Sequence, residues 1–234
     1  MKKTSRRNSG FARRVNIRRV LLAAGAILAC FYAAILIALI LLRWIDPPFT
    51  AVQAERRVAS WFGSQPYRKS YRPVPLHDIS PNLVHACIAA EDTRFFQHHG
   101  FDWKEMGNAV EDGMEGGHPR GASTITQQLV RNLFLSTGRS IFRKAVEFSI
   151  VPLTEMVLTK NRILELYLNV IEWGPGVYGA EASACHYYQV PAARLNSEQG
   201  ADLAAMLPAP LQRRPGQPRW YVARIHTRMR QMGW

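Results

Sequence analysis

Hydrophobic residues first occur in one unbroken run near the N-terminus. From Val20 to Leu42 no residue is charged. As a helix, this run would extend about 34 Å at 1.5 Å per residue, enough to cross a hydrocarbon core of about 30 Å. It is too long for the apolar region of a secretory signal, and no convincing small-residue cleavage site follows it. Residues 27–30 faintly resemble a lipidation box, but the apolar run continues past Cys30. The pattern therefore predicts an uncleaved transmembrane helix over residues 20–42.

Beyond this run, apolar residues recur at spacings of three and four, which is the helical pattern. Ser80 followed by Pro81 is a typical helix start, and this helix is expected to end near Glu91 and Asp92. Pro152 is expected to kink the helix that contains it or to mark a break there. The other predicted helices cover residues 51–62, 123–135, 140–158, 160–170, 197–207 and 219–232. No alternating strand pattern of useful length is present, so the fold class is mainly α.

Glycine and proline mark the predicted loops. Residues 111–122 contain four glycines and a proline and predict a mobile loop. Residues 172–179, with the sequence Glu-Trp-Gly-Pro-Gly-Val-Tyr-Gly, predict a tight loop. Residues 44–79 are rich in proline and predict an irregular lead-in around the short helix at 51–62.

Positive charge is concentrated before the apolar run. The chain has a formal charge of +13. Residues 1–19 contain eight Lys or Arg residues and no acid, so the rest of the chain carries a formal charge of +5. The positive-inside rule then predicts a basic cytoplasmic tail at 1–19, a transmembrane helix at 20–42 and an extracytoplasmic domain at 43–234. The mildly basic remainder fits an anionic membrane surface and argues against a nucleic-acid partner.

Three cysteines are few for an extracytoplasmic chain. Cys30 lies in the apolar run, and Cys87 and Cys185 have neither metal-ligand spacing nor a redox motif. Buried free thiols are expected at Cys87 and Cys185, with a disulfide between them as the less favoured alternative.

A polar stripe is predicted on the helix that begins near Ser123. Thr124, Gln127, Gln128 and Arg131 follow the i, i+3, i+4, i+7 spacing and share one face. A hydroxyl, two amides and a guanidinium suit an anionic, hydroxyl-rich ligand such as a phosphorylated sugar. The alternative is a solvated helix face.

Two groups of charged residues are candidates for chemistry. Glu91 ends an apolar helix, where partial burial and the negative end of the helix dipole are expected to raise the pKa of its carboxyl group, as suits a general acid or base. The alternative for Glu91 is a helix-terminal carboxylate in an ordinary surface ion pair. Asp92 either assists it electrostatically or satisfies backbone amides. Arg143 and Lys144 flank Glu147 at helical spacing and can clamp a diphosphate. A solvent-exposed ion pair is the alternative for these three residues.

Four more residues receive weaker assignments. Glu165 shares a helix face with basic and amide residues, which favours a structural ion pair, whereas Glu172 opens the 172–179 loop and is able to face a ligand. For His98 and His99, which lack a metal-ligand partner at suitable spacing, stabilisation of a turn is favoured over catalysis.

Four motifs occur in a fixed order along the chain. They are Glu91-Asp92-x-x-Phe95-Phe96-x-x-His99-Gly100, Gly121-x-Ser123-Thr124-Ile125-Thr126-Gln127-Gln128-Leu129, Arg143-Lys144-x-x-Glu147 and Ile163-Leu164-Glu165-Leu166-Tyr167-Leu168-Asn169. Together they resemble the peptidoglycan glycosyltransferases of family 51, the transglycosylase domain of penicillin-binding proteins, over about residues 50–232. The 172–179 loop and the single anchor are similar to the monofunctional biosynthetic branch.

The resemblance implies a lysozyme-like glycosyltransferase domain with a smaller membrane-proximal lobe, after one transmembrane helix. It implies that lipid II units are joined by inverting transfer into β-1,4 glycan strands, with release of undecaprenyl diphosphate. Glu91 would deprotonate the acceptor hydroxyl, and Glu147 would act on the leaving-group side beside Arg143 and Lys144. The implied substrate-binding residues are Asp92, Ser123, Thr124, Gln127, Gln128, Arg131, Asn132, Arg143 and Lys144. Family members often have lysine where this chain has Arg131.

The resemblance also implies partners and a location. The substrates would be lipid II and the growing lipid-linked strand, beside the inner membrane of a bacterium, with a periplasmic catalytic domain and cell-division or elongation proteins as further partners. No metal ligand is assigned and no cofactor is required, although a divalent cation (Mg or Mn) bridging the diphosphate and Glu147 is compatible with the chemistry.

Two other functions compete with this one. A lysozyme-type hydrolase also uses a glutamate in an α-rich cleft, but the paired cations at Arg143 and Lys144 favour an anionic leaving group. A non-enzymatic glycan-binding scaffold is disfavoured because both glutamates and both cations are present. The chain lacks the Ser-x-x-Lys and Lys-Thr-Gly motifs of penicillin-sensitive transpeptidases.

Overall fold

The computed structural model describes residues 17–63, 67–114, 123–138 and 140–234. The chain divides into two compact units, which end and begin at Ile37 and Ala38. Most of the basic tail at 1–19 and most of the glycine-rich loop at 111–122 lie outside the described residues.

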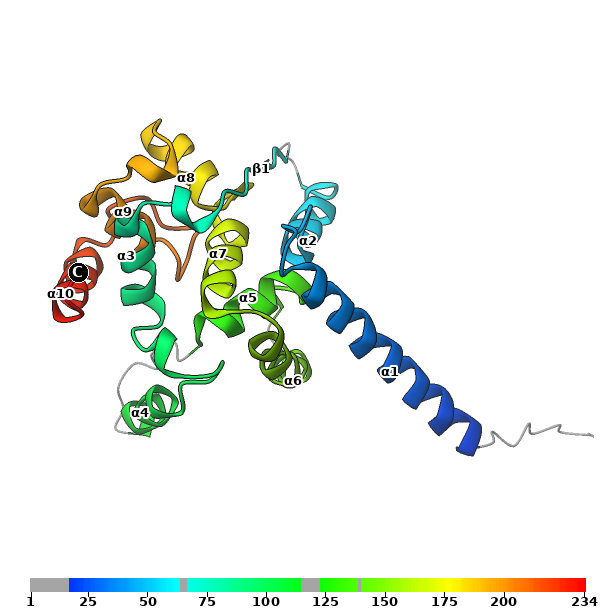
Figure 1. Cartoon of the computed structure of the whole chain (residues 1–234). Helices are drawn as coiled ribbons and strands as arrows, with labels where there is room; N and C mark the ends of the chain where they lie inside the picture. The colour runs from blue at the N-terminus through cyan, green and yellow to red at the C-terminus, as the bar shows by residue number, and fades with distance from the viewer. Residues whose placement is uncertain (1–16, 64–66, 115–122, 139) are drawn as a thin grey trace, which may run out of the picture. The chain divides into compact units, whose positions relative to one another are not determined.

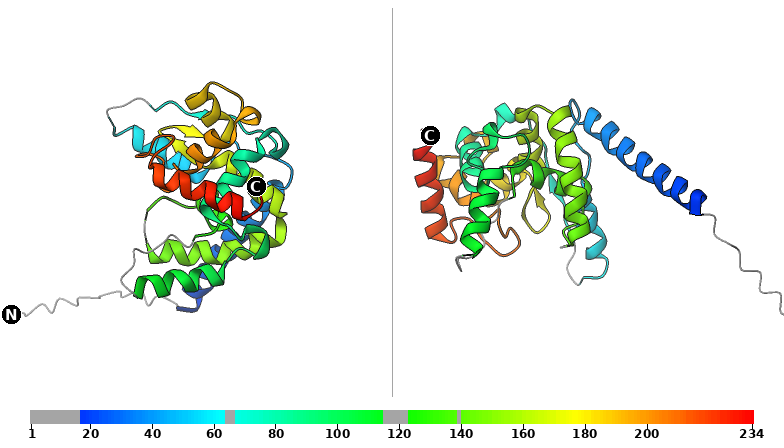
Figure 2. Two further views of the ribbon diagram at one scale, coloured as in Figure 1. Left: turned by 90° about the vertical axis from the view of Figure 1, so that its left-hand side faces the viewer. Right: turned by 90° about the horizontal axis from the view of Figure 1, so that it is seen from below.

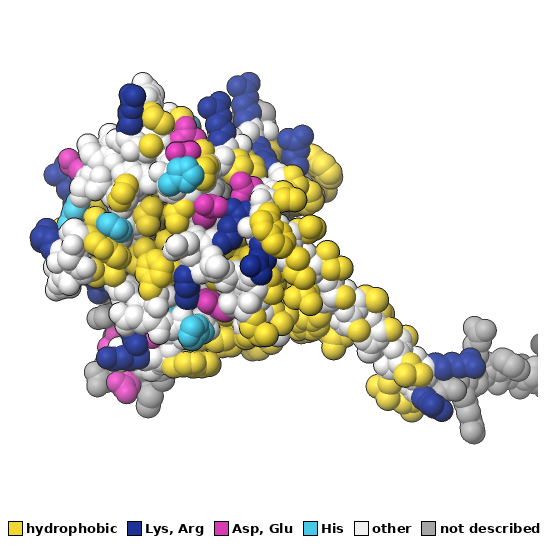
Figure 3. Space-filling view, in the orientation of Figure 1, with side chains coloured by type: hydrophobic (Ala, Val, Ile, Leu, Met, Phe, Trp, Pro, Cys, Tyr) yellow, Lys and Arg dark blue, Asp and Glu magenta, His cyan; other side chains and the backbone are white. Residues whose placement is uncertain are grey.

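The first helix, α1 (Ile17–Leu41), is the predicted apolar run. Within the described part of the chain it is the one helix that is long and apolar enough to cross a membrane. Its surface is hydrophobic along almost its whole length (Figure 3). This helix suggests a single N-terminal membrane anchor.

Helix α3 (Pro81–Glu91) packs against α9 (Ser197–Ala204) and α10 (Arg219–Gln231), which also contact each other, in the larger unit (Figures 1 and 2). The predicted start is confirmed: Asn82 N donates to the Ser80 hydroxyl, and Pro81 occupies the first turn. The backbones of α3 and α9 approach closely at Gly200, where a Cβ atom would lie 2.9 Å from the Asn82 carbonyl. This packing buries the apolar face of α3 and fixes the position of its last residue, Glu91.

Helix α5 (Ile125–Phe134) is the centre of a second group of helices. It packs against α2 (Ala51–Ser60), α6 (Ile141–Val157) and α7 (Lys160–Val170) (Figure 1). Leu129, Ile150 and Ile163 are fully buried where these helices meet. The predicted helices at 51–62, 123–135, 140–158 and 160–170 are thereby confirmed, and α6 continues through Pro152 without a break.

The predicted tight loop at 172–179 is a short hairpin. Strands β2 (Glu172–Gly174) and β3 (Val177–Tyr178) are antiparallel, and β1 (Ser70–Tyr71) pairs with β3 in parallel, which gives the order β1-β3-β2. Gly179 has a φ of 87°, and a Cβ atom there would lie 2.4 Å from the Asn169 carbonyl oxygen, so this turn requires glycine.

The mainly α fold class is confirmed, but two helices were not predicted. These are α4 (Trp103–Met114) and α8 (Ala180–Tyr188). The predicted loop at 111–122 is wrong at its start, because α4 continues to Met114. Three short 3-10 segments complete the described elements: η1 (Leu76–Asp78), η2 (Phe95–Gln97) and η3 (Ala192–Arg194).

Candidate active site

Glu91 lies at the end of α3, where a short hydrogen-bonded chain holds its carboxylate. Gln128 Nε2 of α5 donates to Glu91 Oε2 at 2.6 Å, and the Tyr167 hydroxyl of α7 donates to Gln128 Oε1 at 3.2 Å. Tyr167 is fully buried. Three helices thus fix one carboxylate oxygen, and the amide orientation that they favour is the one that supports an ionised Glu91.

The pKa of Glu91 is raised above its ordinary value of 4.5, mainly because the carboxyl group is buried. The hydrogen bond from Gln128 and the charges of Arg131 and Arg213 oppose this rise, and the charge of Asp92 adds to it. The predicted direction is therefore confirmed. A carboxylate with a raised pKa binds a proton more strongly, which suits a general base.

The predicted polar stripe on α5 is wrong in one respect. The helix begins at Ile125 rather than near Ser123, and Thr124 is its N-cap. Thr124 and Gln127 form a reciprocal capping box: Gln127 N donates to the Thr124 hydroxyl, and Thr124 N donates to Gln127 Oε1. Both side chains are buried, so of the four stripe residues only Gln128 and Arg131 are partly exposed.

Asp92 joins the end of α3 to the start of α5. Its buried carboxylate accepts a hydrogen bond from Ile125 N at 3.0 Å and one from His98 Nε2 at 2.9 Å. The Thr124 hydroxyl donates to the Gly100 carbonyl at 2.7 Å, which adds a second link. Asp92 therefore satisfies a backbone amide, one of its two predicted roles, and the turn-stabilising role predicted for His98 is also observed.

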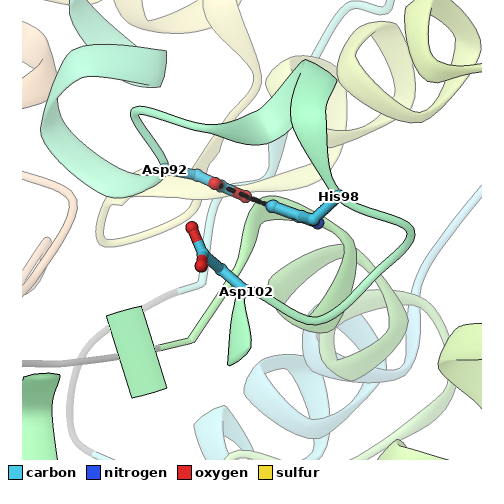
Figure 4. Close-up of side chains that lie close together, drawn as sticks. All are labelled: Asp92, His98 and Asp102. Carbon is cyan, nitrogen blue, oxygen red and sulfur yellow. Dashed lines mark hydrogen bonds and ion pairs between the residues drawn. The ribbon is translucent and has the colours of Figure 1, made fainter. Parts of the chain in front are cut away.

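The structure brings together three potential metal ligands that sequence spacing did not reveal. Asp92, His98 and Asp102 are buried, and their ligand atoms lie within 4.8 Å of one another (Figure 4). These atoms already have partners, because Asp102 Oδ1 accepts from Arg94 at 3.0 Å and from Glu105 N at 3.0 Å. A cation would have to replace these bonds as well as those of Asp92. The prediction that His98 lacks potential metal-ligand partners is thus corrected, but the existing hydrogen bonds favour a structural network.

A first pocket, which we call the Glu91 pocket, has a volume of about 330 Å³. Its walls come from the end of α3, the start of α4, the start of α5 and the segment from Pro208 through α10. The residues are Ala90, Glu91, Asp92, Thr93, Asp102, Glu105, Ser123, Thr124, Pro208, Arg213, Trp220, Tyr221, Arg224 and Arg228. Ser123 and Thr124 thus lie on the same pocket as Glu91.

A second pocket, which we call the arginine pocket, has a volume of about 400 Å³. Its residues are Val52, Arg56, Gln128, Arg131, Asn132, Thr137, Arg143, Tyr167, Ile171, Glu172, Leu207, Pro208 and Pro210. Pro208 lines both pockets, and Gln128 of this pocket contacts Glu91 of the other. The two pockets are therefore neighbours, with the Glu91 carboxylate beside their boundary.

Glu147 of α6 is almost fully buried, so the Arg143–Lys144–Glu147 group is not a solvent-exposed ion pair. Arg143 Nη1 donates to Glu147 Oε2 at 2.8 Å, and Lys144 Nζ donates to Glu147 Oε1. Among the described residues Arg143 lines the arginine pocket, whereas Lys144 and Glu147 line neither pocket. The structure therefore places Glu147 behind Arg143, with both carboxylate oxygens engaged.

The remaining predicted residues have mainly structural contacts. Glu165 accepts hydrogen bonds from Arg162 and from Leu76 N, which confirms the structural ion pair. Cys87 and Cys185 are free thiols, and Cys185 is only partly buried, so the less favoured disulfide is absent. Burial raises the pKa of the Cys87 thiol, which keeps it protonated.

Sequence patterns missed several pocket residues. Arg56, Arg213, Trp220, Arg224 and Arg228 belong to no recognisable motif and reach the pockets only through the fold. Tyr167 lies inside the motif at 163–169, but its spacing gave no indication that it contacts Gln128.

The fold and the site together show a mainly helical domain with a partly buried carboxylate, Glu91, between two pockets, an arrangement that also suits acid–base chemistry on a glycan. Residues 56–232 match the family model described as Transglycosylase. The chain is 44% identical to a biosynthetic peptidoglycan transglycosylase of Pseudomonas syringae pv. syringae (strain B728a), over 87% of this chain and 88% of the relative. It is equally similar, with the same coverage, to the protein of that name from Pseudomonas entomophila (strain L48). This chain belongs to the transglycosylase family, and the lysozyme-like fold that the resemblance implied is the fold of that family.

Proposed function

We propose that this chain is a peptidoglycan glycan-strand polymerase. It joins lipid II disaccharide-peptide units by inverting transfer, forms β-1,4 bonds and releases undecaprenyl diphosphate. The observation that carries the proposal is the position of Glu91 between a pocket able to hold an acceptor sugar and a pocket walled by Arg56, Arg131 and Arg143. The family membership and the names of the relatives support the same reaction.

Glu91 acts as the general base in this proposal. The incoming lipid II lies in the Glu91 pocket, beside Ser123 and Asp92, and gives its acceptor hydroxyl proton to the Glu91 carboxylate. The acceptor oxygen attacks the anomeric carbon of the growing strand from the face opposite the diphosphate, and the configuration is inverted. Gln128 and Tyr167 keep the carboxylate oriented during the transfer.

The arginine pocket receives the diphosphate of the growing strand. Arg131 and Arg143 neutralise the negative charge that develops as the anomeric bond breaks, and Gln128 and Asn132 supply amide groups. A diphosphate is a good leaving group, so the site needs cations more than a strong acid. Glu147 acts on the leaving-group side by holding Arg143 and Lys144, since both of its oxygens are bound to them.

A divalent cation is not assigned a step in this reaction. Both carboxylate oxygens of Glu147 already accept hydrogen bonds from Arg143 and Lys144, both oxygens of Asp92 accept bonds from His98 and Ile125, and Oδ1 of Asp102 accepts bonds from Arg94 and Glu105. Mg²⁺ or Mn²⁺ bound between these groups would have to displace existing hydrogen bonds.

The location follows from the anchor and the charges. Residues 1–19 form a cytoplasmic tail, 20–42 cross the inner membrane of a bacterium once, and 43–234 form the periplasmic catalytic domain. A polyprenyl-linked substrate stays in the bilayer, so an anchored enzyme meets it in two dimensions. Cell-division or elongation proteins are the further partners that this location favours, and nucleic acid is not a partner.

A glycan hydrolase is the second function considered. Cleavage with water needs a general acid at the leaving oxygen and no anion site, whereas the arginine pocket gathers three guanidinium groups beside Glu91. The arginine pocket therefore favours transfer from a diphosphate.

The direct test incubates the detergent-solubilised full chain with labelled lipid II and separates the products on a gel. Lysozyme-sensitive polymer is the expected result. Shortening of preformed glycan without new polymer would favour the hydrolase. Binding of lipid II without any product would favour the scaffold.

A further inference from the structure

Arg56 of α2 lines the arginine pocket, although no motif contains it and, unlike Arg131 and Arg143, it has not been assigned a contact with the diphosphate. Its side chain is 31% exposed, and its Nε atom donates to Glu172 Oε2 at 3.0 Å. Its neighbour Arg57 is exposed and lies over the ring of Tyr67, at 5.8 Å from the centroid, outside the pocket. Of these two adjacent arginines, the fold therefore places Arg56 in the pocket and Arg57 outside it.

The hairpin holds Arg56 in place. Glu172, which we expected from the sequence to be able to face a ligand, lines the arginine pocket. Its side chain is only 6% exposed. Its other oxygen, Oε1, accepts from the Tyr178 hydroxyl at 3.2 Å, and the Tyr67 hydroxyl donates to the Tyr178 oxygen at 3.2 Å. Because Glu172 engages only the Nε atom of Arg56, the two Nη atoms have no hydrogen-bond partner among the described residues.

The charges of the pocket match a diphosphate diester. Its lining residues include three guanidinium groups, from Arg56, Arg131 and Arg143, and a single carboxylate, from Glu172, which leaves a formal charge of +2. The Arg131 guanidinium has no hydrogen bond or ion pair within the described part of the chain, and the buried Nε atom of Arg143 also lacks a partner there. Planar guanidinium forks with free N–H groups bind phosphate oxygens in pairs.

We propose that Arg56, held by Glu172, is a third phosphate-binding residue of the arginine pocket and contacts the diphosphate of the lipid-linked donor. This inference rests on the proposed function and adds to it a contribution from α2, the first helix after the apolar segment. The pairing with Glu172 fixes the guanidinium before the substrate arrives, so less side-chain freedom is lost on binding.

The test measures the binding of a short-chain polyprenyl diphosphate to the detergent-solubilised full chain. The main variant is Arg56→Gln, in which the amide still donates to Glu172 but the charge is removed. The matched control is Arg57→Gln, which removes the same charge one residue away. Loss of a charge-assisted hydrogen bond predicts that Arg56→Gln raises Kd about tenfold, with an unchanged thermal midpoint, while Arg57→Gln leaves Kd unchanged.

A second variant separates the binding contribution from the structural one. Glu172→Gln keeps an acceptor for Arg56 but raises the formal charge of the lining residues from +2 to +3, so Kd is expected to stay the same or to fall. Arg56→Gln is expected to raise Kd in the Glu172→Gln background as well, because Arg56 contributes through its own contact with the diphosphate.

Two results would overturn the inference. The first is an Arg56→Gln chain that binds the diphosphate as tightly as the wild type, and the second is an equal loss in Arg57→Gln. If the wild-type chain neither binds the diphosphate nor polymerises lipid II, the proposed function is overturned and this inference with it. If the wild type polymerises lipid II and Arg56→Gln does so at the same rate, only this inference is overturned.

Discussion

The environment of Glu91 combines two opposing influences on a single carboxyl group. Burial raises its pKa, and the Gln128 amide together with Arg131 and Arg213 favours the ionised form. The titratable and charged groups that interact with Glu91 come from several elements. They are Cys87 and Asp92 near the end of α3, Arg131 on α5, Tyr167 on α7, Arg213 on the segment before α10, and Tyr221 on α10. A general base must be deprotonated to work, so activity is expected to fall as the pH falls through this raised pKa.

Replacing Gln128 tests this balance. Gln128→Leu removes the donor to Glu91 Oε2 and leaves burial unopposed by it, so the pKa of Glu91 rises further. We expect the acidic limb of the pH–activity profile to move to higher pH by about one unit, and by less in Tyr167→Phe, which frees the amide to rotate. The measurement is the polymerisation rate between about pH 5 and pH 9. An equal loss at every pH would show that Gln128 does not tune Glu91.

At the scale of elements, the packing of α3 against α9 determines where Glu91 lies. The two helices approach through Gly200, where an added Cβ atom would lie 2.9 Å from the Asn82 carbonyl carbon and oxygen. Gly107, in the exposed part of α4, has no atom within 4 Å of its Cβ position. An alanine side chain would therefore clash with α3 at position 200, whereas at position 107 it would meet no other atom.

Gly200→Ala is expected to lower the free energy of unfolding by about 1–2 kcal/mol, because α9 must move away from α3. Gly107→Ala is expected to be neutral or to stabilise by up to about 1 kcal/mol, since alanine has the higher helix propensity. Denaturant unfolding of both variants measures the difference. Equal effects at the two positions would mean that the close approach of α3 and α9 does not contribute to stability.

Helical periodicity predicted most elements of the larger unit, because apolar residues recur at spacings of three and four throughout α3, α5, α6 and α7. It missed α8, which is rich in alanine, and α4, whose apolar pattern is interrupted by charged residues. Local sequence also predicted a charged group around Arg143 and Glu147 but not which member reaches the pocket, since exposure depends on neighbouring helices. Arg56 and the segment 208–228 enter the site through tertiary packing, which spacing along the chain does not encode.

At the scale of the whole molecule, the chain separates into an apolar helical unit and a larger unit that begins at Ala38. The larger unit contains the two pockets and all the residues assigned to the reaction. The separation implies that anchoring and catalysis are carried by different parts of the chain.

Removal of residues 1–37 tests this separation. The shortened chain is expected to keep the thermal midpoint and the detergent-phase activity of the full chain, because the contacts of the larger unit are internal to it. On lipid II embedded in vesicles its rate is expected to fall, because the anchor no longer restricts it to the membrane surface. Loss of folding in detergent would contradict the division into two units.

The central claim is that Glu91 is the base of a glycan polymerase. The most direct measurement compares the polymerisation of lipid II by the full chain with that by Glu91→Gln. Glu111→Gln, which removes a negative charge from the exposed side of α4, is the control. We expect Glu91→Gln to fold normally and to lose at least about a hundredfold in rate, with Glu111→Gln unaffected. A folded Glu91→Gln chain that makes polymer at a rate near that of the wild type would contradict the claim and place the base elsewhere.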